Sequence, residues 1–279
     1  MMRALSLAAL TVLELTPPDM VECAAQAGYD CVGLRLIPAT PEEVRHPMLG
    51  DTAMVRETER RLRDTGVCVL DVEIFRLEPH TVVEDFRPVL ETAQRLGASE
   101  VLVAGNDADL PRLAARLAEL CALCAEHGLT PSIEPMPWTD VRDYAQGLRL
   151  IERTGAQANA GILVDPIHFD RGGSRLDEIT ATPRARLRYA QLCDAPAARP
   201  TDRATLLHQA RAERLMPGDG GLDLRGLLRV LPGDIPLALE IPMHTLARSV
   251  PAVERARRML GKTRQLLDAV DLALAGRPA

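Results

Sequence analysis

The sequence is poor in aromatic residues and in long apolar runs. Phe, Trp and Tyr together make up 3% of its 279 residues. This low content argues against an aromatic-rich β-sandwich. We therefore expect a core of Leu, Val, Ala and Ile, a composition that suits parallel strands and Ala-rich helices. No apolar stretch is long enough to span a bilayer, and we therefore expect no membrane partner.

Basic clusters are also missing. Acidic residues outnumber basic ones by 39 to 33, which gives a formal charge of −6. No basic run could follow a phosphate backbone, which argues against nucleic acid as a partner. Lys262 is the only lysine and falls in a predicted C-terminal surface helix. Schiff-base chemistry therefore lacks a well-placed amine.

The six cysteines do not form a metal or disulfide pattern. Cys121 and Cys124 form a C-x-x-C motif inside an Ala/Leu-rich helical run, and no second pair stands at zinc-finger spacing. We expect the cysteines to be reduced and the protein to be cytoplasmic. The first ten residues carry one Arg and no persuasive cleavage site, which argues against a signal peptide.

Glycine and proline divide the chain into alternating strands and helices. The apolar runs predict eight strands, at residues 3–10, 29–36, 67–75, 101–103, 130–134, 161–165, 187–193 and 236–240. Helices are predicted at residues 17–26, 52–64, 82–96, 109–127, 140–153, 177–182, 223–231 and 250–274. Residues 194–221 form the longest irregular stretch, which is usually functional or carries a small helix.

This alternation predicts an α/β fold, a (β/α)₈ TIM barrel, with residues 1–279 as a single domain. The rival fold is a doubly wound open sheet. Its nucleotide-binding forms are disfavoured, because no G-x-G-x-x-G follows the first strand and no G-x-x-x-x-G-K-[ST] occurs.

The stretch Ile162-Leu163-Val164-Asp165-Pro166-Ile167-His168 carries the strongest chemical signal. Its apolar run is typical of a strand buried on both faces, and Pro166 ends the strand. Asp165 is thus expected at the carboxyl end, where barrels keep their chemistry. The alternative is that Asp165 only caps the next helix.

Three other predicted strands end in a similar way, and their carboxyl ends open on the same face of a barrel. The four candidate metal ligands are Glu134, Asp165, Gln191 and Glu240. These hard oxygen donors suit Mn²⁺ or Mg²⁺, with Co²⁺ or Zn²⁺ as alternatives. A cap or a salt bridge is the simpler interpretation of each residue alone, but less so of all four together.

Three further residues are candidates for substrate binding. His168 lies one turn past Asp165 and could orient a substrate oxygen, although packing is the simpler role. Arg35 ends the second strand and could point into the barrel mouth or form an outward salt bridge. Trp138, the only tryptophan, could wall the pocket or merely pack.

At these residues the chain resembles the xylose isomerase-like (β/α)₈ barrels, which include sugar isomerases and epimerases, inosose dehydratases and 3-dehydroshikimate dehydratases. The resemblance covers nearly the whole chain. It rests on Ile133-Glu134-Pro135, Asp165-Pro166-Ile167-His168, Gln191-Leu192-Cys193-Asp194, Pro217-Gly218-Asp219-Gly220 and Leu239-Glu240. Two positions depart from the family pattern: Gln191 stands where many relatives have His, and Asp219 replaces Glu.

The resemblance implies a divalent metal on the four ligands, with Glu134 and Glu240 as the acid/base pair. It thus implies a metal-dependent isomerase or epimerase of a sugar or related polyhydroxy-carbonyl compound. A dehydratase of the inosose or 3-dehydroshikimate type uses the same metal and base, so the sequence leaves it open. A barrel that binds a sugar without turnover is a lower alternative. Relatives are often dimers or tetramers, so a homo-oligomer is an open expectation.

Overall fold

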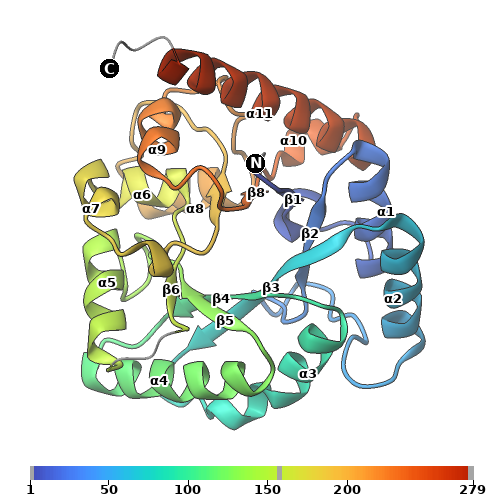
Figure 1. Ribbon diagram of the computed structural model, residues 1–279, viewed down its shortest axis with the longest axis vertical. Coiled ribbons are helices and arrows are strands. Elements are labelled where there is room, and N and C mark those ends of the chain that lie inside the picture. Colours follow the sequence, from blue (N-terminus) through green and yellow to red (C-terminus); the bar gives the residue numbers. More distant parts are fainter. Residues whose placement is uncertain (1–2, 156–158, 276–279) are drawn as a thin grey trace.

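The structure is a computed structural model that describes residues 3–155 and 159–275. Within these ranges eight parallel strands alternate with helices, and Figure 1 shows the helices as a ring around the strands. The strands are β1 (Leu5–Leu7), β2 (Cys31–Arg35), β3 (Cys68–Leu77), β4 (Glu100–Gly105), β5 (Thr130–Ile133), β6 (Gly161–Ile162), β7 (Ala190–Leu192) and β8 (Leu237–Leu239). Their spatial order is β6-β5-β4-β3-β2-β1-β8-β7.

The two ends of this order meet and close the sheet. Val164, just beyond β6, forms a parallel bridge with Ala190 of β7. The amide of Gln191 also donates to the carbonyl of Val164 at 2.9 Å. The predicted (β/α)₈ barrel is therefore confirmed. The expectation of a single domain over residues 1–279 stays a prediction, and residues 1–2, 156–158 and 276–279 lie outside the described residues.

Most helices begin and end at the signals that the sequence carries. The helices are α1 (Pro17–Ala27), α2 (Ala53–Thr65), α3 (Arg87–Arg95), α4 (Leu110–Glu126), α5 (Tyr144–Arg153), α6 (Pro166–Arg171), α7 (Leu176–Thr180), α8 (Arg203–Arg211), α9 (Leu224–Val230), α10 (His244–Ala247) and α11 (Ala252–Ala275). For example, the Thr52 side chain accepts from the Val55 amide to cap α2, and Gly66 ends this helix at φ 73°. A positive φ favours glycine, so the turn matches the residue.

The structure corrects several predicted boundaries. The first strand ends at Leu7, because residues 9–12 form a 3₁₀ helix in which the Thr11 hydroxyl donates to the Leu239 carbonyl at 2.7 Å. The helix expected from residue 140 begins only at Tyr144, where the Asp143 side chain caps it by accepting from the Gln146 amide. The sequence predicted neither α6 nor α10.

The cysteine expectation is wrong for one pair. Cys31 of β2 and Cys68 of β3 lie opposite each other in the register of the two strands, and a disulfide joins them. The parallel pairing brings their Cα atoms to 4.4 Å, a separation that a disulfide spans. The other cysteines are free and buried, as expected for small apolar side chains. Within the described ranges no helix is both long and apolar enough to cross a membrane.

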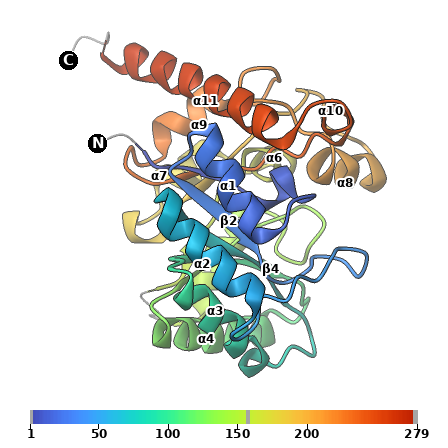
Figure 2. The ribbon, with the colours of Figure 1, turned by 90° about the vertical axis from the view of Figure 1, so that its right-hand side faces the viewer.

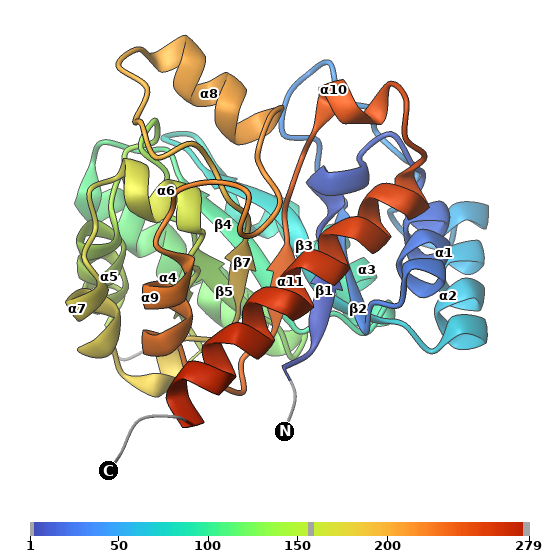
Figure 3. The same cartoon turned by 90° about the horizontal axis from the view of Figure 1, so that it is seen from above.

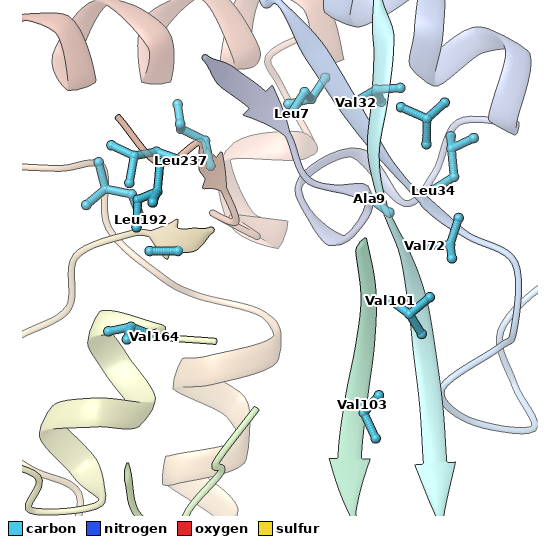
Figure 4. Close-up of a cluster of buried hydrophobic side chains, with 14 of the residues drawn as sticks. Leu7, Ala9, Val32, Leu34, Val72, Val101, Val103, Val164, Leu192 and Leu237 are labelled. Atoms are coloured by element: carbon cyan, nitrogen blue, oxygen red, sulfur yellow. The ribbon is translucent and has the colours of Figure 1, made fainter. Parts of the chain in front are cut away.

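Alternation along the strands separates two apolar layers. The larger layer packs the outer faces of the strands against the helices, and Figure 4 shows part of it, including Leu7, Val32 and Leu192. The smaller layer fills the inside of the barrel and contains Leu102 and Tyr189. Because successive strand residues face opposite sides, the outward residues fix which of their neighbours point inward.

The segment after β7 rises over the mouth of the barrel. Figure 3 shows α8 and α10 on the side opposite the N-terminus that leads into β1, which is where the strands end. Figure 2 shows the same two helices together at one side of the molecule. The Asp194 carboxylate anchors the Pro217–Gly221 turn, since it accepts from the amides of Gly218, Gly220 and Leu222 at 3.0–3.1 Å.

Candidate active site

The strand alternation directs the predicted acids into the barrel. Ile133, Val164 and Leu239 belong to the outer layer. The residues that follow them therefore point inward, and these are Glu134, Asp165 and Glu240. By the same rule Gln191 faces inward between Ala190 and Leu192. All four predicted ligands are at least 96% buried. Glu134 and Glu240 directly follow β5 and β8, Asp165 lies three residues after β6, and Gln191 lies within β7.

Glu134, Asp165 and His168 form the centre of this site. The Nε2 atom of His168 lies 3.8 Å from Oε1 of Glu134 and 4.0 Å from Oδ2 of Asp165. One ligand atom from each of the three residues lies within 4.8 Å of the others, which is close enough to share a metal ion. His168 is therefore a candidate ligand as well as the predicted substrate contact.

Asp165 has two roles at once. Its Oδ1 atom accepts from the amides of Ile167 and His168 at 2.8 and 3.3 Å, and so caps α6. Pro166 occupies the first turn of this helix, where its missing N–H costs nothing. The cap turns the chain so that His168 faces back toward the acids. The two interpretations of Asp165 that the sequence left open, a helix cap and a member of the site, are thus compatible.

Arg214 joins two of the acids and was missed by the sequence analysis. Its guanidinium contacts Oδ2 of Asp165 at 2.6 Å and Oε2 of Glu240 at 2.7 Å. It also donates to the carbonyls of Ala210 at 2.7 Å and Glu240 at 3.0 Å. The side chain is 2% exposed, so this is a buried ionic network.

Two antiparallel bridges place Arg214. Leu215 pairs with Asp194 at the end of β7, and Glu213 pairs with Met243 beyond β8. The segment thus passes between the ends of these two strands, and Arg214 points into the barrel. The only sequence signal was an arginine in an apolar context just before Pro217-Gly218, which is too weak to identify a site residue.

Burial and charge set the protonation of the site. Burial, and then the charges of Glu240 and Asp165, raise the pKa of Glu134 well above its usual value. Burial also raises the pKa of Glu240 to about 7 despite the Arg214 charge. For Asp165 burial acts upward, but the Arg214 charge and the hydrogen bonds from Arg214 and from the His168 amide lower its pKa overall. Burial lowers the pKa of His168 to about 4, so its imidazole is neutral at pH 7.

The donor set fits a divalent ion. Oε1 of Glu134 and Oε1 of Gln191 are buried acceptors without a hydrogen-bond partner. Such orphaned atoms are costly unless a ligand satisfies them. A cation would also hold in ionised form the clustered carboxylates that burial otherwise pushes toward protonation. Glu134 and Asp165, with Gln191, Glu240 or His168, are the residues that could hold it.

The other two predicted residues lie at the mouth. The Arg35 guanidinium is already held by Glu73 at 2.8 Å and Glu43 at 2.9 Å, so its charge is balanced within the chain. The Trp138 ring packs edge-on against His168, with centroids 4.9 Å apart. Trp138 therefore lies beside the acid cluster of Glu134, Asp165 and His168, where its ring would form one wall of a pocket. Lys262 lies on α11 and pairs with Asp219, in keeping with the predicted surface helix.

A closed ring of parallel strands with buried acids at its carboxyl ends is the architecture of TIM-barrel enzymes. Residues 21–266 match the model of the xylose isomerase-like TIM barrel family, so the chain belongs to this family. A 3-dehydroshikimate dehydratase from Pseudomonas aeruginosa is 28% identical over 95% of the chain. The chain spans only 44% of that relative's length.

Solved structures share the fold. The chain matches the IOLI protein, solved with a bound zinc atom, at a TM-score of 0.76 and 16% identity, over 96% of this chain and 97% of that one. It matches a D-allulose 3-epimerase from Methylomonas sp., in complex with D-allulose, at 0.69 and 16%, over 95% and 98%. At these identities the likeness shows the fold alone. The Glu134–Asp165–His168 cluster is a candidate divalent metal site on its own geometry.

Proposed function

We propose that this protein is a divalent-metal-dependent isomerase or epimerase of a small polyhydroxy-carbonyl compound. One observation carries the proposal: Glu134 and Glu240, which directly follow β5 and β8, are two buried carboxylates beside Asp165. Glu134 belongs to the Asp165–His168 cluster, and Glu240 shares Arg214 with Asp165. A proton exchange between two faces or two carbons of a substrate requires two such acid/base groups.

One divalent ion would be held by Glu134, Asp165, Gln191 and Glu240. Because these ligands are all oxygen donors, Mn²⁺ or Mg²⁺ is expected. Co²⁺ and Zn²⁺ are the alternatives, and the neutral His168 nitrogen would favour them if it ligates. When bound, the ion supplies Lewis-acid polarisation of the substrate carbonyl, which acidifies the adjacent C–H. Arg214 would keep Asp165 and Glu240 in place through its two ion pairs.

The two glutamates would move the proton. One carboxylate takes the proton from the carbon next to the carbonyl, and a proton then returns to the other face of that carbon or to the neighbouring carbon. The pKa of Glu240, raised to about 7, suits a carboxylate that both accepts and donates a proton near neutral pH, and the pKa of Glu134 is raised as well. The neutral imidazole of His168 would hold a substrate hydroxyl, with Trp138 as a wall and Arg35 at the mouth.

A dehydratase is the second candidate, favoured by the 28% identity to 3-dehydroshikimate dehydratase over 95% of the chain. The first step is the same proton removal. A β-hydroxyl then takes a proton from an acid of the site and leaves as water. A barrel that binds a sugar without turnover is a weaker alternative, because it gives no role to the two facing glutamates.

Metal content is the first test. Inductively coupled plasma mass spectrometry of the purified protein should find about one divalent ion per chain, and Asp165→Ala should lose it. A parent protein that takes up no Mn²⁺, Mg²⁺, Co²⁺ or Zn²⁺ would refute the metal site.

Turnover is the second test. Ketoses such as D-allulose, inososes and 3-dehydroshikimate should be screened with each metal. Glu240→Gln should abolish turnover, whereas Glu100→Gln, a buried acid at the start of β4, should retain it. Full activity in Glu240→Gln would refute the role of this residue, and the product would decide between isomerisation and dehydration.

A further inference from the structure

The wall of the barrel mouth carries nitrogen donors that lack a matching acceptor. The Nε1 atom of Trp138 is buried without a hydrogen-bond partner. The guanidinium of Arg211, at the end of α8, forms no side-chain hydrogen bond or ion pair with the residues that the structure describes, and it lies over the face of Trp138, 5.5 Å from the ring centroid. Arg76, at the end of β3, reaches only neutral oxygens, of Asn106 at 3.4 Å and Ala39 at 3.5 Å.

Two of these donors, Trp138 and Arg211, lie beside the Glu134–Asp165–His168 cluster. The Trp138 ring lies between Arg211 and His168, whose centroid is 4.9 Å from that of the indole. His168 in turn is 3.8 Å from Glu134. A small ligand at the cluster would thus extend along Trp138 toward the two arginines. Figure 3 shows α8, which carries Arg211, over the end of the barrel.

The positive charge at this wall is not balanced locally. Glu43 acts on both arginines, but its carboxylate is already held by Arg35 and by the Ala39 amide at 2.7 Å. Glu134 acts on Arg76 as well, but it belongs to the proposed metal site. Glu78 also acts on Arg76, but its side chain is 42% exposed. Partial burial, and then repulsion by the Arg76 charge, lower the pKa of Arg211. An anion between them would remove this repulsion.

We propose that Arg76 and Arg211, with the indole N–H of Trp138, form a subsite for a carboxylate or phosphate group, so that the substrate is an acid rather than a neutral sugar. The planar guanidinium groups match the paired oxygens of either anion. The inference deepens the proposed function and rests on it for the chemistry at the acid cluster. It assigns the two arginines to substrate selection and leaves proton transfer to Glu134 and Glu240.

Matched ligand pairs test this subsite by isothermal titration calorimetry on the metal-loaded full chain. One pair is 3-dehydroshikimate and its methyl ester, and the other is D-allulose 6-phosphate and D-allulose. At least one acid should bind about tenfold to a hundredfold more tightly than its neutral partner, the range for charge-assisted hydrogen bonds. The pair that shows the difference identifies the anion as carboxylate or phosphate.

The variants Arg211→Gln and Arg76→Gln should each remove most of that difference and leave the neutral ligand unaffected. Arg203→Gln is the matched control, because Arg203 is an exposed arginine on the same helix and takes no part in the subsite. The inference is overturned if neither acid binds more tightly than its neutral partner, if no acid binds, or if Arg211→Gln weakens both members of a pair equally.

The same variants separate this inference from the proposed function. Arg211-dependent binding of an acid without metal-dependent turnover of any ligand would support the subsite and refute the enzyme. Metal-dependent turnover of D-allulose that Arg211→Gln leaves unchanged would support the enzyme and refute the subsite.

Discussion

Replacing Arg214 by Met should destabilise the metal-free protein more than any surface substitution. The arginine is 2% exposed and forms ion pairs with Asp165 and Glu240, in addition to its bonds to two backbone carbonyls. Met fills a similar volume but leaves both carboxylates buried without a counter-charge. Removing one partner of a buried ion pair costs about 3–5 kcal/mol, so we expect a loss in this range in the free energy of unfolding.

Urea denaturation followed by circular dichroism measures this loss. The matched control is Arg199→Met, because Arg199 is 57% exposed and pairs with Asp170 at the surface. An exposed pair contributes at most about 1 kcal/mol, so the control should change little.

A saturating divalent metal should reduce the loss in Arg214→Met, because an ion beside Asp165 supplies a positive charge in place of the arginine. A loss below about 1 kcal/mol in the metal-free variant would refute the view that Arg214 neutralises the two acids. An equal loss with and without metal would show that no ion binds close to Asp165.

Three further substitutions test other parts of the structure. Burial raises the pKa of Glu100 from 4.5 to about 7, so the folded protein binds this proton more tightly than the unfolded chain, and the free energy of unfolding falls as the pH rises through this window. Urea titrations of the parent at pH 4.5 and 7.5 should show a fall on the order of 3 kcal/mol, and this fall should disappear in Glu100→Gln. Gly33→Ala would place a Cβ 2.8 Å from Oδ1 of Asp71, so thermal unfolding should show a loss of about 1–3 kcal/mol, and an unchanged melting temperature would contradict this packing. Asp194→Ala removes the acceptor of the Gly218, Gly220 and Leu222 amides, so protection of these amides from hydrogen exchange should fall; protection equal to the parent would show that the turn does not need Asp194.

The barrel could be predicted because its signals are local. Apolar runs such as Leu237-Ala238-Leu239 specify buried strands, and glycines such as Gly66 end helices at a φ that other residues avoid. Acids that directly follow these runs must emerge at one end of a parallel barrel, whatever the side-chain details. The convergence of Glu134, Asp165 and Glu240 thus follows from the strand pattern and the closure of the sheet.

The eight strands, most of the helices, the barrel and the acids at its mouth follow from hydrophobic period and from the glycines and prolines that end the elements. The position of Arg214 does not, because two bridges to segments beyond β7 and β8 hold it in the barrel, and the Cys31–Cys68 pair depends on the register of two strands. It also set Arg211 against Trp138. These contacts join residues far apart in the chain, and no local pattern encodes which of many arginines or cysteines will meet.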